Sequence, residues 1–95
     1  MKPRTETLNE RFERLARRLE VTVEELRGGC RRQELVDARC MVAAQLVELP
    51  GVRQQDVADL FCVSQAAVSK LLVRHGNLME VDSGYRRRVY GLVKS

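Results

Sequence analysis

The most informative part of the sequence runs from Gln54 to Val73 and reads QQDVADLFCVSQAAVSKLLV. Its apolar residues recur at helical spacing and predict two short helices that lock together across a tight turn. The locking set is Val57, Ala58, Leu60, Phe61, Val63, Val68, Leu71 and Leu72. Polar and small side chains are left on the opposite face of the second helix. This is the pattern of a helix-turn-helix, about residues 53–75, whose second helix fits the major groove of DNA.

Particular positions make this pattern more specific than a pair of ordinary amphipathic helices, which is the alternative. Ala58 is small where the two helices should cross most closely, and Val63 is expected to close the turn from inside. Ser64 is placed to cap the second helix. Cys62 departs from the pattern, because glycine is usual at a turn position that often needs a positive φ. We expect either some backbone strain at Cys62 or a turn of different shape.

Composition indicates one small domain, residues 1–95, with a moderate excess of basic residues. The chain has 17 basic and 13 acidic residues, a net charge of +4, and 14 of the basic residues are arginine. Arginine suits phosphate and base edges, although +4 is also an ordinary aid to solubility. We expect a cytoplasmic protein, because no stretch has the length of a membrane span or the character of a signal peptide. Since it begins with Met1 and a capped helix, we also expect a complete small chain.

The three cysteines and the single histidine give little reason to predict chemistry. Cys30, Cys40 and Cys62 form no closely spaced pair, so a zinc site with His75 is not expected. An odd cysteine count fits a reducing compartment. No serine, histidine and aspartate set suggests catalysis, and we expect no enzyme activity, no cofactor, no metal and no small-molecule substrate.

The flanking segments predict further helices and no strand. Thr5 or Thr7 is expected to cap a first helix, and Thr22 to Glu25 forms a capping box for a short second one. A longer helix from about Gln33 to Leu49 is apolar on so many sides that it should be central. The fold class is therefore all-α, a compact bundle of five or six helices.

Near the end of the chain, His75, Gly76 and Asn77 are expected to end or interrupt the second helix of the helix-turn-helix. Asp82 and Ser83 should cap a last helix. The consecutive residues Arg86, Arg87 and Arg88 lie on that helix and should point in different directions, so we expect a solvated face rather than one focused basic patch.

Three blocks of the chain, in order, resemble the C-terminal DNA-binding domain of the bacterial replication initiator DnaA, which is similar in turn to the Trp repressor fold. They are LARRLEVTVEELRG (residues 15–28), RRQELVDARCMVAAQL (31–46) and VADLFCVSQAAVSKL (57–71). The resemblance implies that the second helix of the helix-turn-helix reads the major groove and that a basic loop reaches the adjacent minor groove. No phosphate-binding loop of the ATPase type is present, so the family's ATP-driven assembly is not expected here.

The reading motif of that family, Asp-His-Thr-Thr, is replaced here by Ser64, Gln65, Ala66 and Ala67. These four side chains offer fewer and different hydrogen-bonding groups to base edges, so the family's preferred DNA sequence should not be assumed. Gln65 and Ser69 are the expected base contacts, and the resemblance places Arg31 and Arg32 at the minor groove. The complete set of candidate DNA contacts is Arg31, Arg32, Arg39, Arg53, Gln54, Ser64, Gln65, Ala66, Ala67, Ser69, Lys70 and Arg74.

These observations predict a double-stranded DNA-binding protein that serves as a small transcription or replication-associated regulator. The alternative, motivated by Ala66 and Ala67, is a protein–protein interaction module that keeps the fold but has lost base reading. A homodimer or another partner protein is compatible with either function.

Overall fold

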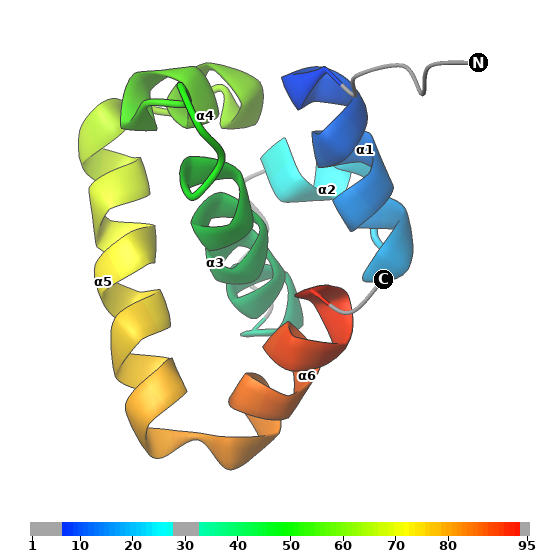
Figure 1. Cartoon of the computed structure of the whole chain (residues 1–95), viewed down its shortest axis with the longest axis vertical. Coiled ribbons are helices and arrows are strands. Elements are labelled where there is room, and N and C mark those ends of the chain that lie inside the picture. Colours follow the sequence, from blue (N-terminus) through cyan, green and yellow to red (C-terminus); the bar gives the residue numbers. More distant parts are fainter. Residues whose placement is uncertain (1–6, 28–32, 94–95) are drawn as a thin grey trace.

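The computed structural model describes residues 7–27 and 33–93, and this part of the chain forms six α-helices and no strand (Figure 1). The helices are α1 (Leu8–Arg18), α2 (Val23–Arg27), α3 (Gln33–Val47), α4 (Gln54–Phe61), α5 (Gln65–Val81) and α6 (Ser83–Val93). The predicted all-α class is confirmed. None of these helices is long and apolar enough to cross a membrane.

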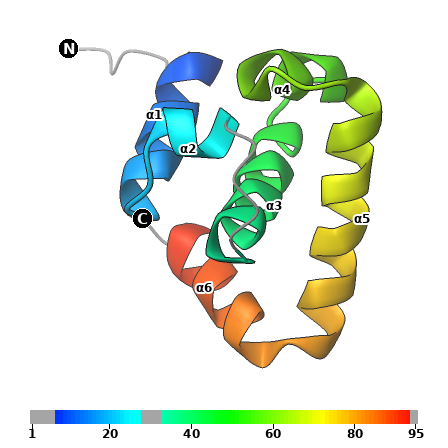
Figure 2. The same ribbon diagram turned by 180° about the vertical axis from the view of Figure 1, so that it is seen from behind.

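The third helix, α3, is the centre of the bundle, as its composition predicts. The other helices surround it in both views, with α1 and α2 on one side and α5 on the other (Figures 1 and 2). Its most deeply buried side chains, all 0–1% exposed, are Ala38, Cys40, Met41, Val42, Ala43 and Leu46. The helix ends at Val47, two residues before the predicted end, and Gly51 turns the chain with φ of 80°.

The two N-terminal helices begin at capping boxes, which confirms the predicted threonine cap of the first and the predicted capping box of the second. Thr7, one of the two predicted residues, caps α1: its Oγ1 accepts from the Glu10 N–H, while the Glu10 carboxylate accepts from the Thr7 N–H at 3.0 Å. Thr5 lies outside the described residues. Thr22 and Glu25 make the same reciprocal pair at the start of α2. Each box satisfies backbone donors that a helix start leaves unpaired.

Contacts between α1, α2 and α4 fix the end of α4, from which the turn to α5 departs. The Phe12 and Phe61 rings meet edge to face with centroids 5.1 Å apart, and both are buried. Arg27 donates through Nε to the Leu60 carbonyl at 2.6 Å, and its guanidinium carbon lies 5.6 Å from the Phe12 ring centroid. The N-terminal helices therefore support α4 rather than forming a separate appendage.

The helix α5 is longer than predicted, and the expected break at His75, Gly76 and Asn77 is wrong. The helix continues to Val81 because Gly76 and Asn77 lie on its exposed side, while Leu78 and Met79 on the inner side pack against the core. Packing of that inner side overrides the low helix propensity of glycine, about 1 kcal/mol.

The last helix, α6, turns back from the end of α5 and runs toward α1 (Figure 1), and side chains of its first turns brace α5. As predicted, Asp82 caps it: the Asp82 carboxylate accepts from the Tyr85 N–H at 3.0 Å. Arg86 donates through Nε to the Met79 carbonyl at 2.9 Å and through Nη2 to the Glu80 carbonyl at 3.3 Å, at the end of α5.

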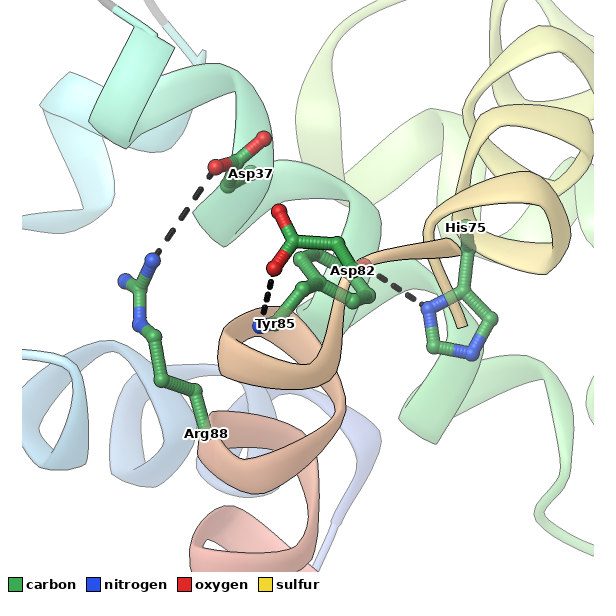
Figure 3. A network of polar contacts seen from close by, with 5 residues as sticks. All are labelled: Asp37, His75, Asp82, Tyr85 and Arg88. Atoms are coloured by element: carbon green, nitrogen blue, oxygen red, sulfur yellow. Dashed lines mark hydrogen bonds and ion pairs between the residues drawn. The ribbon is translucent and has the colours of Figure 1, made fainter. Parts of the chain in front are cut away.

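A polar network joins α3, α5 and α6 (Figure 3). His75 Nδ1 and Tyr85 Oη lie 2.8 Å apart, and Arg88 approaches Asp37 on α3 at 4.0 Å. His75 is therefore a half-buried residue within α5 and does not mark the predicted end of a helix. The three arginines form no single patch, as predicted, but the expected solvated face holds only in part, because Arg86 bonds to the end of α5 and Arg88 approaches Asp37.

Candidate nucleic-acid interface

The turn between α4 and α5, residues 62–64, is built around a left-handed residue. Cys62 has φ of 57° and ψ of 43°, and the Val63 N–H donates back to the Ala58 carbonyl at 3.0 Å. Cysteine thus adopts the conformation for which glycine is favoured, at a cost of about 1–2 kcal/mol. Of the two possibilities raised by the sequence, strain at Cys62 is the one observed.

Ser64 caps α5 as predicted. Its backbone is extended, with φ of −78° and ψ of 159°, and its Oγ accepts from the Ala67 N–H at 3.2 Å. The cap fixes where α5 starts, so the first exposed side chains on the helix are Gln65 and Ala66.

The crossing of α4 and α5 is closely packed. Val57, Ala58 and Val68 are fully buried and Phe61 is 1% exposed, as the pattern predicts. Val63 is the exception: it is 39% exposed, so the prediction that it closes the turn from inside is wrong. Phe61 fills the interior instead, and Val63 lies at the rim of a surface depression of about 230 Å³ that Ala67 and Lys70 also line.

The outer face of α5 presents most of the predicted reading residues to solvent. Ser64, Gln65, Ala66 and Lys70 are exposed, whereas Ala67 is half-buried. One turn further along, Arg74 is exposed on the same helix. This face is uniform in one respect: no acidic residue occurs between Gln65 and Met79.

Two of the predicted DNA contacts are bonded to each other. Ser69 is half-buried, and its hydroxyl donates to Gln54 Oε1 at 2.7 Å, which ties the start of α4 to α5. The Ser69 hydroxyl proton is therefore already engaged in a hydrogen bond within the protein. The bond also fixes the orientation of the Gln54 amide, whose oxygen faces Ser69.

The predicted arginine contacts differ in where the structure places them. Arg39 is half-buried and donates through Nε to the Leu26 carbonyl at 2.9 Å and through Nη2 to the Glu25 carbonyl at 3.0 Å. It holds the end of α2, a role that its position in the sequence does not reveal. Arg53 is exposed just before α4, and its backbone N–H donates to the Asp56 carboxylate at 2.9 Å, which leaves the guanidinium out of this bond. Arg31 and Arg32 lie outside the described residues.

Sequence reasoning named Ser69, Lys70 and Arg74 but missed Asn77 as part of the same surface of α5. A depression of about 400 Å³ is lined by Ser69, Lys70, Val73, Arg74 and Asn77, and Val73 is 66% exposed. Helical spacing alone places residues 70, 73, 74 and 77 on one face. The prediction of a helix end near Gly76 leaves Asn77 off this face.

Burial of three titratable side chains on α3, α5 and α6 favours their uncharged forms. Burial raises the pKa of the Cys40 thiol to about 11, although Arg74 opposes this shift. Burial also lowers the pKa of His75 and raises that of Tyr85. Positive charge on α5 at neutral pH therefore comes from Lys70 and Arg74.

Metal binding finds no support in the part of the chain that the structure describes. In residues 7–27 and 33–93, no three histidine, cysteine, aspartate or glutamate residues come together in a group that could hold a metal ion. Cys40 is buried and Cys62 is exposed, and both are free thiols.

Comparison with known proteins adds no further guide: no protein-family model, curated protein or solved structure matches this chain.

Proposed function

We propose that this protein binds double-stranded DNA through a helix-turn-helix formed by α4, the turn at residues 62–64 and α5. The observation that carries the proposal is the two-sided character of α5. Its inner side is fixed by the fully buried Val68 and the packed leucines, while its outer side from Gln65 to Arg74 exposes small, amide and basic groups, with one apolar residue, Val73, and no carboxylate. A rigid, non-acidic helix face suits the negatively charged major groove.

The exposed side chains at the start of α5 have the chemistry for base contacts. A glutamine such as Gln65 can pair with adenine through its single side-chain amide, whose carbonyl accepts from N6 and whose NH2 donates to N7, and the methyl group of Ala66 can contact a thymine methyl. Ser69 is less suited to this task than Gln65, because its proton already bonds Gln54. We therefore assign base reading chiefly to Gln65 and phosphate anchoring to Lys70, Arg74 and Arg53.

In keeping with the resemblance to the DnaA DNA-binding domain, we propose a role in transcription or replication-associated regulation, exercised in the cytoplasm by binding rather than catalysis. Because the four reading residues differ from those of that family, the DNA sequence bound here should be its own. Selection of bound duplexes from a random pool identifies that sequence, and also shows whether one or two half-sites are read.

A salt titration tests the proposal, with a labelled duplex as the probe and fluorescence anisotropy as the readout. Each phosphate neutralised by lysine or arginine contributes about −0.9 to the slope of log K against log salt concentration. With contacts from Arg53, Lys70 and Arg74 alone, we expect a slope of about −3. Absence of saturable binding at low salt, or a flat titration, is incompatible with the proposal.

A protein-interaction module is the second candidate, and the exposure of Val73 and Ala66 is the observation that favours it. These apolar side chains are flanked by Lys70 and Arg74, which makes the face mixed rather than continuously apolar. We therefore rank DNA first. Self-association or capture of a protein ligand that Val73→Asp abolishes, with no affinity for duplex DNA, would reverse the ranking.

A further inference from the structure

We propose that Asn77 is an additional DNA contact, which together with Lys70 and Arg74 holds one sugar-phosphate ridge beside the bases read by the start of α5. This inference rests on the proposed DNA binding and extends it to a residue that sequence reasoning placed at a helix break.

A single row of exposed side chains runs along the outer face of α5. It contains Ala66, Lys70, Val73, Arg74 and Asn77, while Leu78 and Met79 turn inward. Ala66 and Asn77 are eleven residues apart, or about three helical turns, so they point in nearly the same direction. A surface that contacts Ala66 and continues along the helix therefore meets Asn77.

The depression at the lower end of this row has the chemistry of a nucleic-acid backbone site. Lys70 and Arg74 supply cations that pair with phosphate, and the Asn77 amide can donate a hydrogen bond to a phosphate oxygen. Val73 lies among them, 66% exposed, where it can pack against the apolar face of a sugar. Charged, amide and apolar groups are thus brought together on about two turns of one helix.

The length of α5 explains why the part of the helix that carries Asn77 should contact the sugar-phosphate backbone and not the bases. Gln65 and Asn77 are separated by about 18 Å along the helix axis. The major groove is only about 12 Å wide, and residues at the start of such a helix contact the base edges. When Gln65 reaches a base, the turn that carries Asn77 lies beyond the groove wall.

Two neighbouring residues define where this contact ends and keep its helical turn in place. Glu80 is the next exposed residue along the row, and its carboxylate repels phosphate. Arg86 on α6 donates to the carbonyls of Met79 and Glu80, which holds the turn that follows Asn77. The proposed DNA-contacting surface of α5 therefore ends between Asn77 and Glu80.

The test compares Asn77→Ala with Asn9→Ala, which makes the same chemical change on an exposed part of α1. Binding of a labelled random-sequence duplex is measured by anisotropy over a range of salt concentrations. Asn77→Ala should weaken binding about tenfold with an unchanged salt slope, because it removes a hydrogen bond to a charged group but no charge. Arg74→Ala should weaken binding and also reduce the magnitude of the slope by about 0.9. Glu80→Gln should strengthen binding, and Asn9→Ala should bind like the unaltered protein.

The outcomes separate this inference from the proposed function. If the unaltered protein does not bind duplex DNA, the proposed function is refuted and the Asn77 contact falls with it. If the unaltered protein and Arg74→Ala behave as expected but Asn77→Ala binds like Asn9→Ala, only the Asn77 contact is refuted. Circular dichroism confirms folding, which alanine in a helix should favour over asparagine.

Discussion

Replacing Cys62 by glycine should stabilise the protein, because Cys62 is a non-glycine residue in the left-handed region, with φ of 57° and ψ of 43°. This conformation costs an L-residue about 1–2 kcal/mol, and glycine avoids the cost. Glycine also gives the unfolded chain more freedom, which offsets about 0.5–1 kcal/mol of the gain. The net expectation is an increase of about 0.5–1 kcal/mol in the free energy of unfolding. For a domain of this size, that raises Tm by roughly 2–8 °C.

Thermal and urea unfolding, followed by circular dichroism under reducing conditions, measure this change. Cys62→Ala is the matched control, since it removes the thiol but keeps the left-handed strain. The exposed Cys62 side chain contributes little packing, so Cys62→Ala should leave stability nearly unchanged. Equal stability of the glycine and alanine variants would refute the claim that the turn stores strain at residue 62. The glycine variant should also keep the proposed affinity for DNA, because the turn geometry is preserved.

Further predictions concern the buried Phe61, the Ser64 cap of α5 and His75, which lies at hydrogen-bond distance from Tyr85. Phe61→Ala should lower the free energy of unfolding by about 3–5 kcal/mol, since it removes a buried ring packed against Phe12; urea unfolding measures this, and a loss under 1 kcal/mol would contradict that packing. Ser64→Ala should cost about 1 kcal/mol through loss of the α5 cap, whereas Ser64→Asp should retain the cap, and equal urea midpoints for the two variants would argue against it. Because burial lowers the pKa of His75 below the unfolded value of about 6.5, stability should fall as the pH drops through 6.5 towards the folded pKa. His75→Gln should show less of this fall in the urea midpoint between about pH 7 and pH 5, and parallel pH curves would exclude His75 as its source.

The sequence predicts the helical elements well where local rules decide them. Thr7, Thr22, Ser64 and Asp82 each cap the helix that their side-chain chemistry predicts. The central place of α3 follows from its apolar character on several sides. Short-range capping and periodicity require only neighbouring residues, and those are visible in the sequence.

The failures arise where contacts between distant segments decide the outcome. Local propensity argues for a break at Gly76, but the brace from α6, including Tyr85 at hydrogen-bond distance from His75, keeps α5 helical to Val81. The sequence pattern predicts that Val63 points inward, but Val63 is partly exposed, and Phe61 occupies the interior, where it packs against Phe12 on α1.

The candidate site divides in the same way. Exposure of Gln65, Ala66, Lys70 and Arg74 follows from helical periodicity and agrees with the prediction. The Ser69–Gln54 bond joins side chains fifteen positions apart and depends on how α4 crosses α5. Arg39 likewise bonds to backbone carbonyls thirteen and fourteen positions away. Such pairings cannot be assigned from the spacing of residues along one helix.

DNA binding by α5 can be observed residue by residue in a chemical-shift map of the backbone amides of the 15N-labelled protein, recorded as duplex DNA from the random-pool selection is added. If the outer face of α5 enters the major groove, the largest shifts should occur from Ser64 to Arg74 and extend to Asn77, while α1 residues such as Glu13 and Arg17 remain unchanged. Shifts that concentrate on α1 or α6 and spare Gln65 and Lys70, or no shifts at all, would contradict the account.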